Sequence, residues 1–465
     1  MEILDTLVTR EITLISNNYN IPSSHKWELY IKANGKVFKV YYVKDLKLDR
    51  LYHMNFTDEL RVTVGVMFGD LQQGIVPYKD ALEVELIYIP QYSMNINEVA
   101  RDGKMVKGVY KAHLNIAGAD SVAGDNPLTV AKEKSNQHIL DIELQLYSKT
   151  IDDIKKKTFG TTFRDTPAID AVVYVLLKYS VGESNDPNTS VLGVSLDETF
   201  EKLPRTHIVV KHDTLVTDVP HVIDDVVGGL HPAQMRYYLQ DRFWYIYPIL
   251  DHKRWGSNQP SLTVIKIPKH RLQNVDRSYR LSGENLIILT TKETVHQDHS
   301  ESKQLNEGNG VRFLDARTVM DGLVETQDNK AVIQASDSMT EVAYEERKDG
   351  SNFITGGGAK ITDKYNKEYA RMAMMSGAYI QTYWENADVN LLKPGMPVRY
   401  IFQDGETTRE LYGTLNAVET LDYNTNNTIK EPRFNTLALL TIFVSKKNPL
   451  AKEDSVSSVT ETKTT

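Results

Sequence analysis

Apolar and polar residues alternate with a period of two over many short stretches of this chain, and this alternation limits its fold more than any other feature. In the stretch Pro394–Tyr423, a rigid Pro394-Gly395-Met396-Pro397 lead-in precedes a predicted strand. Val398, Tyr400 and Phe402 point to one side of this strand, because successive side chains of a strand point to opposite faces of a sheet. The stretch has no pattern of catalytic side chains, so it predicts a sheet that packs and pairs.

Two further strands continue this predicted antiparallel sheet. The next one is expected over 411–421, with Leu411, Leu415 and Leu421 on one face, and a third follows over 434–444. Together with the first strand they form a predicted meander.

The same alternation recurs through residues 1–150. Asn34-Gly35 lies between two β-rich runs, which is the strongest short-range signal for a hairpin. Further strands are predicted over 60–68, 82–88, 105–116 and 137–147. We therefore expect residues 1–150 to form a first tube-like, antiparallel β-barrel domain.

Helical patterns appear after residue 150. Thr166 and Pro167 are typical of a helix start, and apolar residues of helical spacing follow over 169–177. A shorter helix is expected to start at Pro232, followed by an aromatic run over 243–247. Residues 151–270 are therefore predicted to form a smaller α+β insert domain.

Strand patterns return towards the C-terminal end. Residues 271–445 are expected to form a second tube-like barrel, interrupted by a long excursion over 296–375 that is poor in large apolar residues. Residues 446–465 are mostly Lys, Glu, Ser and Thr, a composition that predicts a disordered tail. The expected fold class is mainly β, with two barrels and an α+β insert.

Composition excludes several classes of function. The 465 residues include no cysteine, which rules out disulfides and cysteine nucleophiles. A net charge of −8 argues against a nucleic-acid-binding protein, which usually has a basic surplus. No apolar run approaches the roughly 20 residues that span a membrane, and the first residues do not resemble a signal peptide. We expect no membrane anchor.

Two short motifs resemble a metal site and a phosphate-binding loop, but neither is sufficient to predict a binding site. The run from His296 to Glu301 contains imidazole and carboxylate groups that could bind a metal ion, although a hydrophilic loop is the simpler interpretation. Gly356-Gly357-Gly358 precedes Lys360, yet a phosphate loop needs Ser or Thr directly after the lysine. We expect a flexible loop there.

Other candidate groups are also explained more simply by structure than by chemistry. Adjacent carboxylates and basic clusters are expected to form solvated surface, and the aromatic run is expected to be core. These groups are Asp152-Asp153, Asp224-Asp225, Glu345-Glu346, Lys155-Lys156-Lys157, His252-Lys253-Arg254 and Phe243–Tyr247. The sequence therefore predicts a protein that is not an enzyme, with no catalytic, metal-binding or cofactor-binding residues and no cofactor.

Pro394, Gly395, Pro397 and Val398 form a lead-in motif, and Tyr412 and Gly413 follow it in the return strand. By this structural motif the C-terminal meander resembles the baseplate hub protein of contractile-tailed bacteriophages, which initiates the tail tube and anchors the spike. Leu415 stands where the family's return strand has valine. Gln240–Trp244 and Ile265–Pro268 are similar to the hub's insert domain.

This resemblance implies a homotrimer in which three chains present six barrels. Such a ring would join a three-fold central spike to the six-fold tail tube and line the channel through which phage DNA passes without specific binding. Its expected partners are the spike, the tube or tube-adaptor proteins and the baseplate wedge proteins. The implied location is the virion tail baseplate, assembled in the host cytoplasm.

Two other functions remain open from the sequence. One is another virion tail or adaptor protein built from similar barrels. The other is a carbohydrate-binding or carbohydrate-cleaving protein, which the tyrosine-rich composition and the many carboxylates would suit.

Overall fold

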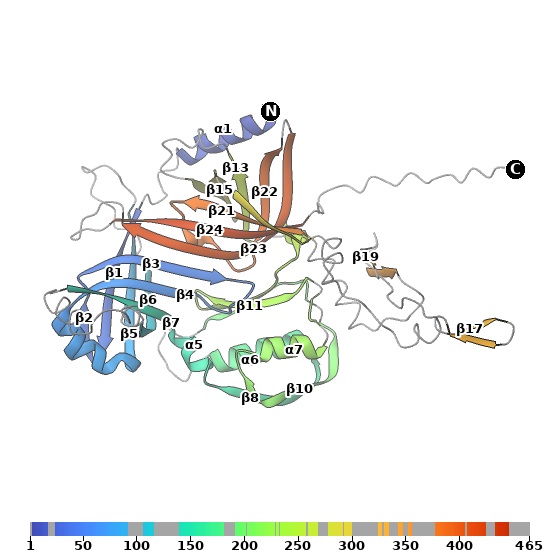
Figure 1. Cartoon of the computed structure of the whole chain (residues 1–465), viewed down its shortest axis with the longest axis horizontal. Coiled ribbons are helices and arrows are strands. Elements are labelled where there is room, and N and C mark those ends of the chain that lie inside the picture. The colour runs from blue at the N-terminus through green and yellow to red at the C-terminus, as the bar shows by residue number, and fades with distance from the viewer. Residues whose placement is uncertain are drawn as a thin grey trace.

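The fold is that of a computed structural model, drawn in Figure 1. It describes residues 2–16, 24–91, 106–115, 139–180, 191–200, 202–227, 229–231, 233–256, 259–267, 278–291, 293–299, 324–327, 330–333, 343–346, 352–355, 377–404, 407–424 and 433–445. The chain is mainly β with an α+β insert, as the alternation predicts.

The first unit contains the strands predicted within residues 1–150 and one further strand, β3 (Tyr42–Leu51), that was not predicted. The others are β1 (Ser24–Ala33), β2 (Lys36–Lys39), β4 (Glu59–Met67), β5 (Leu82–Gln91), β6 (Val106–Asn115) and β7 (Ile139–Ser148). Short helical turns link β4 to β5, namely α2 (Phe68–Asp70), η1 (Leu71–Ile75) and η2 (Val76–Ala81). The strands pair antiparallel in the order β3-β4-β7-β6-β5-β1. Asn34 and Gly35 both have positive φ, as a two-residue hairpin turn requires.

Two long strands close the first unit into a ring. The C-terminal meander forms β22 (Pro397–Asp404), β23 (Thr407–Asn424) and β24 (Phe434–Ser445). The later half of β23 pairs with β3, and β24 meets β1 at the pair His25 and Phe434. Because β23 and β24 also pair with each other, eight strands complete the circuit.

The other halves of β23 and β24 belong to a second curled sheet. Its further strands are β13 (Ser261–Lys266), β14 (Tyr279–Ser282), β15 (Asn285–Thr290), β16 (Glu293–His299) and β21 (Gly377–Glu385). The order is β14-β15-β13-β22-β23-β24-β21-β16, and β13 runs parallel to β15 and β22. The sheet is thus mixed, and β13 joins it although its residues lie in the range predicted for the insert. The domain boundaries at 150 and 270 stay predictions.

A β-bulge at Asn416 separates the two halves of β23. The register with β24 shifts between Leu415 and Ala417, so one extra residue reverses the alternation beyond this point. Leu415 is fully buried, whereas Leu421 is 38% exposed. The expectation that both leucines lie on one face was therefore wrong.

The insert packs helices on short strands. Its elements are α5 (Lys149–Ile154), β8 (Thr158–Pro167), α6 (Ala168–Ser180), β9 (Gly193–Leu196), β10 (Pro204–Leu215), α7 (Val219–Val227), β11 (Met235–Gln240), β12 (Phe243–Pro248) and η3 (His252–Arg254). The helix predicted after Thr166 is α6, which buries Ile169, Val172 and Leu176.

The helix predicted from Pro232 was wrong, because β11 occupies this stretch. β11 and β12 form an antiparallel hairpin around Asp241 and Arg242, both of which have positive φ. The tyrosines and aromatic residues of the two strands suit a sheet better than a helix.

Four hydrophobic clusters form the cores. One lies inside the first unit, one inside the insert and one inside the second unit. The fourth lies where α1 (Glu2–Ser16) covers the outside of β13, β15 and β22, with Val8 and Ile15 against Ile265 and Ile401.

The predicted excursion over 296–375 is described only in part. It begins in β16 and includes two two-stranded sheets, β17 (Val324–Gln327) with β18 (Lys330–Ile333) and β19 (Ala343–Glu346) with β20 (Asn352–Thr355). The glycine-rich stretch at Gly356–Gly358 and the predicted tail over 446–465 lie outside the described residues.

Candidate functional site: the junction of the three units

The motif that carries the resemblance forms a tight turn against the insert. Met396 N donates to Lys393 O, Pro394 takes the second position of the turn and Gly395 the third, with φ +62. This pattern is that of a type II turn. A Cβ added at Gly395 would overlap the Tyr247 ring of β12. Position 395 therefore needs glycine for two reasons: its φ is positive, and the Tyr247 ring leaves no room for a side chain.

The turn is also held by side chains of the insert. Arg254 Nη1 donates to Gly395 O at 2.7 Å, and Arg254 Nε lies 2.6 Å from Asp197 Oδ2. Met396, Pro397 and Val398 are buried behind the turn. The second unit thus begins its sheet from a turn that the insert fixes.

The return strand contributes Tyr412 and Gly413 to the interior of the sheet. A Cβ at Gly413 would overlap the backbone carbonyl of Phe443 on β24, so the close approach of these strands needs glycine. Tyr412 is buried and donates to Glu410 Oε2 at 2.8 Å. Burial and the neighbouring Glu410 carboxylate raise the pKa of Tyr412 to about 12.

Arg50 is the centre of the junction between the three units. This buried guanidinium lies against Asp58, with Nη2 to Oδ2 at 3.1 Å, and donates through Nη1 to Val389 O at 2.8 Å. Asp58 also accepts from Tyr238 Oη at 2.9 Å. One arginine thereby connects β3 of the first unit, the insert and the segment η5 (Val389–Leu391) before the turn.

Gln240 makes a second link of the same kind. Its amide oxygen accepts from Tyr52 Oη at 3.2 Å, and its amide nitrogen donates to Leu392 O at 2.7 Å. Asp241, next in the chain, forms an ion pair with Lys393 at 2.8 Å. Burial raises the pKa of Tyr52 and Tyr238 above the ordinary value, so both hydroxyls remain protonated donors.

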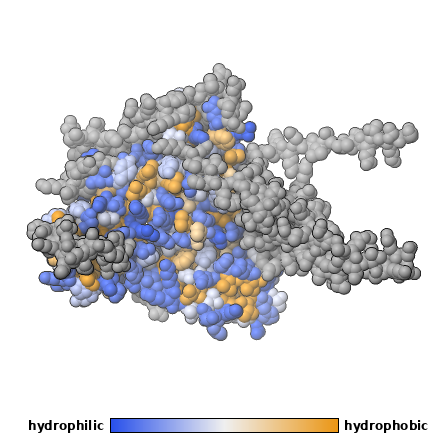
Figure 2. All heavy atoms as spheres, in the orientation of Figure 1, coloured by the Kyte–Doolittle hydropathy of each residue, from blue (hydrophilic) through white to orange (hydrophobic). Residues whose placement is uncertain are grey.

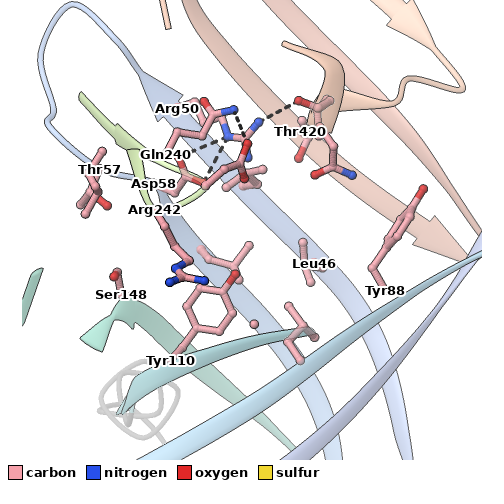
Figure 3. A pocket seen from close by; sticks show the side chains of 18 of the residues that line it. Leu46, Arg50, Thr57, Asp58, Tyr88, Tyr110, Ser148, Gln240, Arg242 and Thr420 are labelled. Atoms are coloured by element: carbon pink, nitrogen blue, oxygen red, sulfur yellow. Dashed lines mark hydrogen bonds and ion pairs between the residues drawn. The ribbon is translucent and has the colours of Figure 1, made fainter. Parts of the chain in front are cut away.

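A cavity of about 390 Å³ lies beside these contacts, at one end of the first unit. Figure 3 shows Arg50 and Asp58 at its upper wall and Arg242 beside the Tyr110 ring. The wall combines leucines with aromatic and charged residues, among them Leu46, Leu48, Leu60, Leu86, Trp27, Tyr88, Tyr110, Asp388 and Asp422. Burial, with the Asp58 carboxylate nearby, raises the pKa of Tyr110 to about 12.

The seam that closes the first unit lies on another side of this cavity. His25 Nε2 is 3.0 Å from Asp422 Oδ2, and Trp27 Nε1 donates to the same oxygen at 2.7 Å. Both partners of the His25–Asp422 pair are buried. Among the described residues one backbone pair joins β1 to β24, and these side-chain contacts lie beside it.

The other sequence candidates are dispersed. The run beginning at His296 lies on β16 and beyond it, and its side chains are outside those described. Asp152 binds Lys111 and Lys156. His221, Asp224 and Asp225 lie together on α7, where burial raises the pKa of Asp224. Of the aromatic run, Trp244 and Ile246 are core residues of the insert.

Sequence reasoning missed Arg50 and Asp58, and it named Gln240 only as the first residue of the run that is similar to the hub's insert domain. The only local signal was a charged residue, Arg50, at the end of a strand pattern, followed eight positions later by an acid. Val389 and Leu392, whose carbonyls they bind, are far away in the sequence, and no spacing rule connects them.

No known protein family and no curated protein matches this chain. Among the described residues, none of the helices has the length and apolar character needed to cross a membrane.

Several solved structures match most of the length of this chain at low sequence identity. A tail protein from Neisseria meningitidis MC58 has a TM-score of 0.43 and 8% identity, covering 89% of this chain and 96% of its own. A 43 kDa tail protein of prophage MuSo2 from Shewanella oneidensis has a TM-score of 0.42 and 8% identity, covering 89% and 97%.

A third similar structure is an E. coli component of the type VI secretion system, described as similar to the T4 bacteriophage tail proteins gp27 and gp5. It has a TM-score of 0.39 and 9% identity, covering 90% of this chain and 77% of its own.

Proposed function

We propose that this chain is a structural protein of a phage tail baseplate hub. In this role three copies join a central spike to a six-fold tail tube and line the channel for DNA. The proposal assigns no catalytic step to the chain.

The observation that carries the proposal is the sharing of β23 and β24 by two ring-like units. Both strands pass from one unit into the other, so each chain holds two β units on one continuous sheet. Three such chains would present six units, which matches three-fold to six-fold symmetry. A continuous hydrogen-bonded sheet also suits a wall that transmits force.

The junction supports the same role. Arg50 and Gln240 connect both units and the insert through buried hydrogen bonds. Because broken bonds of buried polar groups are costly, these contacts hold the units in one relative orientation. An adaptor between two symmetric assemblies needs a fixed orientation of this kind.

The mass of the isolated protein in solution tests the proposal. One chain has a mass of 52.8 kDa, and a closed trimer would have about three times that mass, roughly 158 kDa. We expect light scattering to give the trimer mass. A single-chain mass at every concentration, with or without a spike protein, would contradict the trimeric hub, and glycan-binding assays would then test the carbohydrate alternative.

A further inference from the structure

The insert ends in a two-stranded ribbon whose outer face is turned away from both β units. The ribbon consists of β8 and β10, and among the described residues these strands pair only with each other. Its inner face buries Phe159, Ile208 and Val210 in the core of the insert. Figure 1 shows α6 and α7 between the ribbon and the rest of the molecule.

The outer face of the ribbon is basic. Arg164 lies opposite His207, Thr166 opposite Arg205, and Thr162 opposite Val209. The alternation of β10 continues this face to Lys211.

Acids are confined to the ends of this run. Asp165, with φ +46, precedes Thr166, and Asp213 lies in the irregular segment between Val210 and Thr214. Among the described residues, Arg164, His207 and Lys211 form no ion pair. In a chain with net charge −8, this face is a local exception.

Basic and apolar groups lie together on this face. Arg164 lies directly opposite His207. Val209, in the middle of the face, is 57% exposed. Figure 2 shows apolar side chains gathered on the surface at the lower margin of the molecule, where Figure 1 places the insert. A negatively charged partner would pair with Arg164 and Lys211 and cover the valine.

We propose that the ribbon is a docking surface for an acidic, extended segment of another protein chain. Among the described residues the outer edges of β8 and β10 have no strand partner, so such a segment can add there as a further strand. Its carboxylates then lie against Arg164 and Lys211. This docking surface is additional to the hub role and does not depend on it.

A polypeptide suits the ribbon better than a nucleic acid does. The strand edges present alternating N–H and C=O groups, and another backbone pairs with both. A phosphate chain accepts from the N–H groups but has no donor for the C=O groups. Neither Val209 nor Thr162, at the centre of the face, offers an aromatic ring on which a base could stack.

The test is binding of a labelled peptide of alternating Thr and Glu, as long as the 12 residues of β10, followed by fluorescence anisotropy. The variant R164E/K211E reverses two exposed charges on the outer face. The matched control K36E/K39E reverses two exposed lysines on β2 of the first unit. A peptide of alternating Thr and Lys and a DNA duplex serve as comparison probes.

We expect the wild type and K36E/K39E to bind the acidic peptide, with an affinity that falls as salt rises, and R164E/K211E to bind roughly tenfold more weakly. The proposal is overturned if the wild type does not bind the peptide at low salt, or if R164E/K211E binds it equally well. DNA that binds more tightly than the peptide and is lost in R164E/K211E would also overturn it. Light scattering on the same variants reports trimer formation separately.

Discussion

At the scale of single residues, the two glycines of the resemblance motif are fixed by close approach. Gly395 faces the Tyr247 ring and Gly413 faces the Phe443 carbonyl, so neither position has room for a side chain. Gly395 has the added need for positive φ. The motif therefore marks two places of close contact. Gly395 lies where the second unit meets the insert, and Gly413 lies where β23 approaches β24.

A pair of substitutions separates these two needs. Gly283 has φ +63, almost the same as Gly395, but an added Cβ there would meet nothing within 4 Å. We expect Gly283→Ala to lower the free energy of unfolding by about 1 kcal/mol, and Gly395→Ala by about 3 kcal/mol, because the latter also collides with Tyr247. Denaturant unfolding measures both values. Equal losses would show that the Tyr247 contact carries no cost.

The motif could be found from the sequence, but the residues that surround it could not. Pro-Gly predicts a turn by local rules alone. Arg50 and Gln240 act through carbonyls of Val389 and Leu392, and such partners depend on the tertiary fold. The spacing of residues in the sequence does not distinguish a buried arginine from an exposed one.

At the scale of elements, the bulge at Asn416 lets one strand serve two interiors. Before the bulge, β23 turns Leu415 into the second unit, and beyond it Thr420 and Asp422 line the cavity of the first. Without the extra residue the same alternation would continue, and the polar and apolar positions beyond it would exchange faces.

Leucines on the two sides of the bulge test this arrangement. We expect Leu415→Ala to lower the free energy of unfolding by about 2–5 kcal/mol, since the side chain is fully buried. Leu421→Ala should change it by no more than about 0.5 kcal/mol, since Leu421 lies on the exposed face. Thermal and denaturant unfolding give both numbers. A large loss of unfolding free energy in Leu421→Ala would mean that the bulge does not reverse the alternation of β23.

Strands with clear alternation and a standard turn were predictable, whereas β11 was not. Asn34-Gly35 marks the first hairpin, but the turn between β11 and β12 uses Asp241 and Arg242. Arginine is unusual at positive φ, so the sequence offered no turn signal, and Met235, Tyr238 and Leu239 fitted the spacing of a helix. Tertiary contacts of Gln240 and Asp241 hold this turn in place.

At the scale of the whole molecule, the sharing of β23 and β24 couples the stability of the two β units. If β23 and β24 separate from the strands of one unit, the strands of the other unit lose hydrogen-bonded neighbours as well. The insert has a core of its own around α6, whereas its residues Tyr238, Tyr247 and Ile249 belong to the core of the second unit. We therefore expect the two β units to unfold as one cooperative body, in the sense that any disturbance of one spreads to the other.

Matched leucine truncations test this coupling. Leu144 is buried in the first unit, Leu286 in the second and Leu176 in the insert. We expect Leu144→Ala and Leu286→Ala each to cost about 2–5 kcal/mol and to lower the temperature of the same calorimetric transition. Leu176→Ala is the control, because its core lies outside the shared strands. If Leu144→Ala and Leu286→Ala moved two different transitions, the β units would be independent, and β23 and β24 would connect them without coupling them.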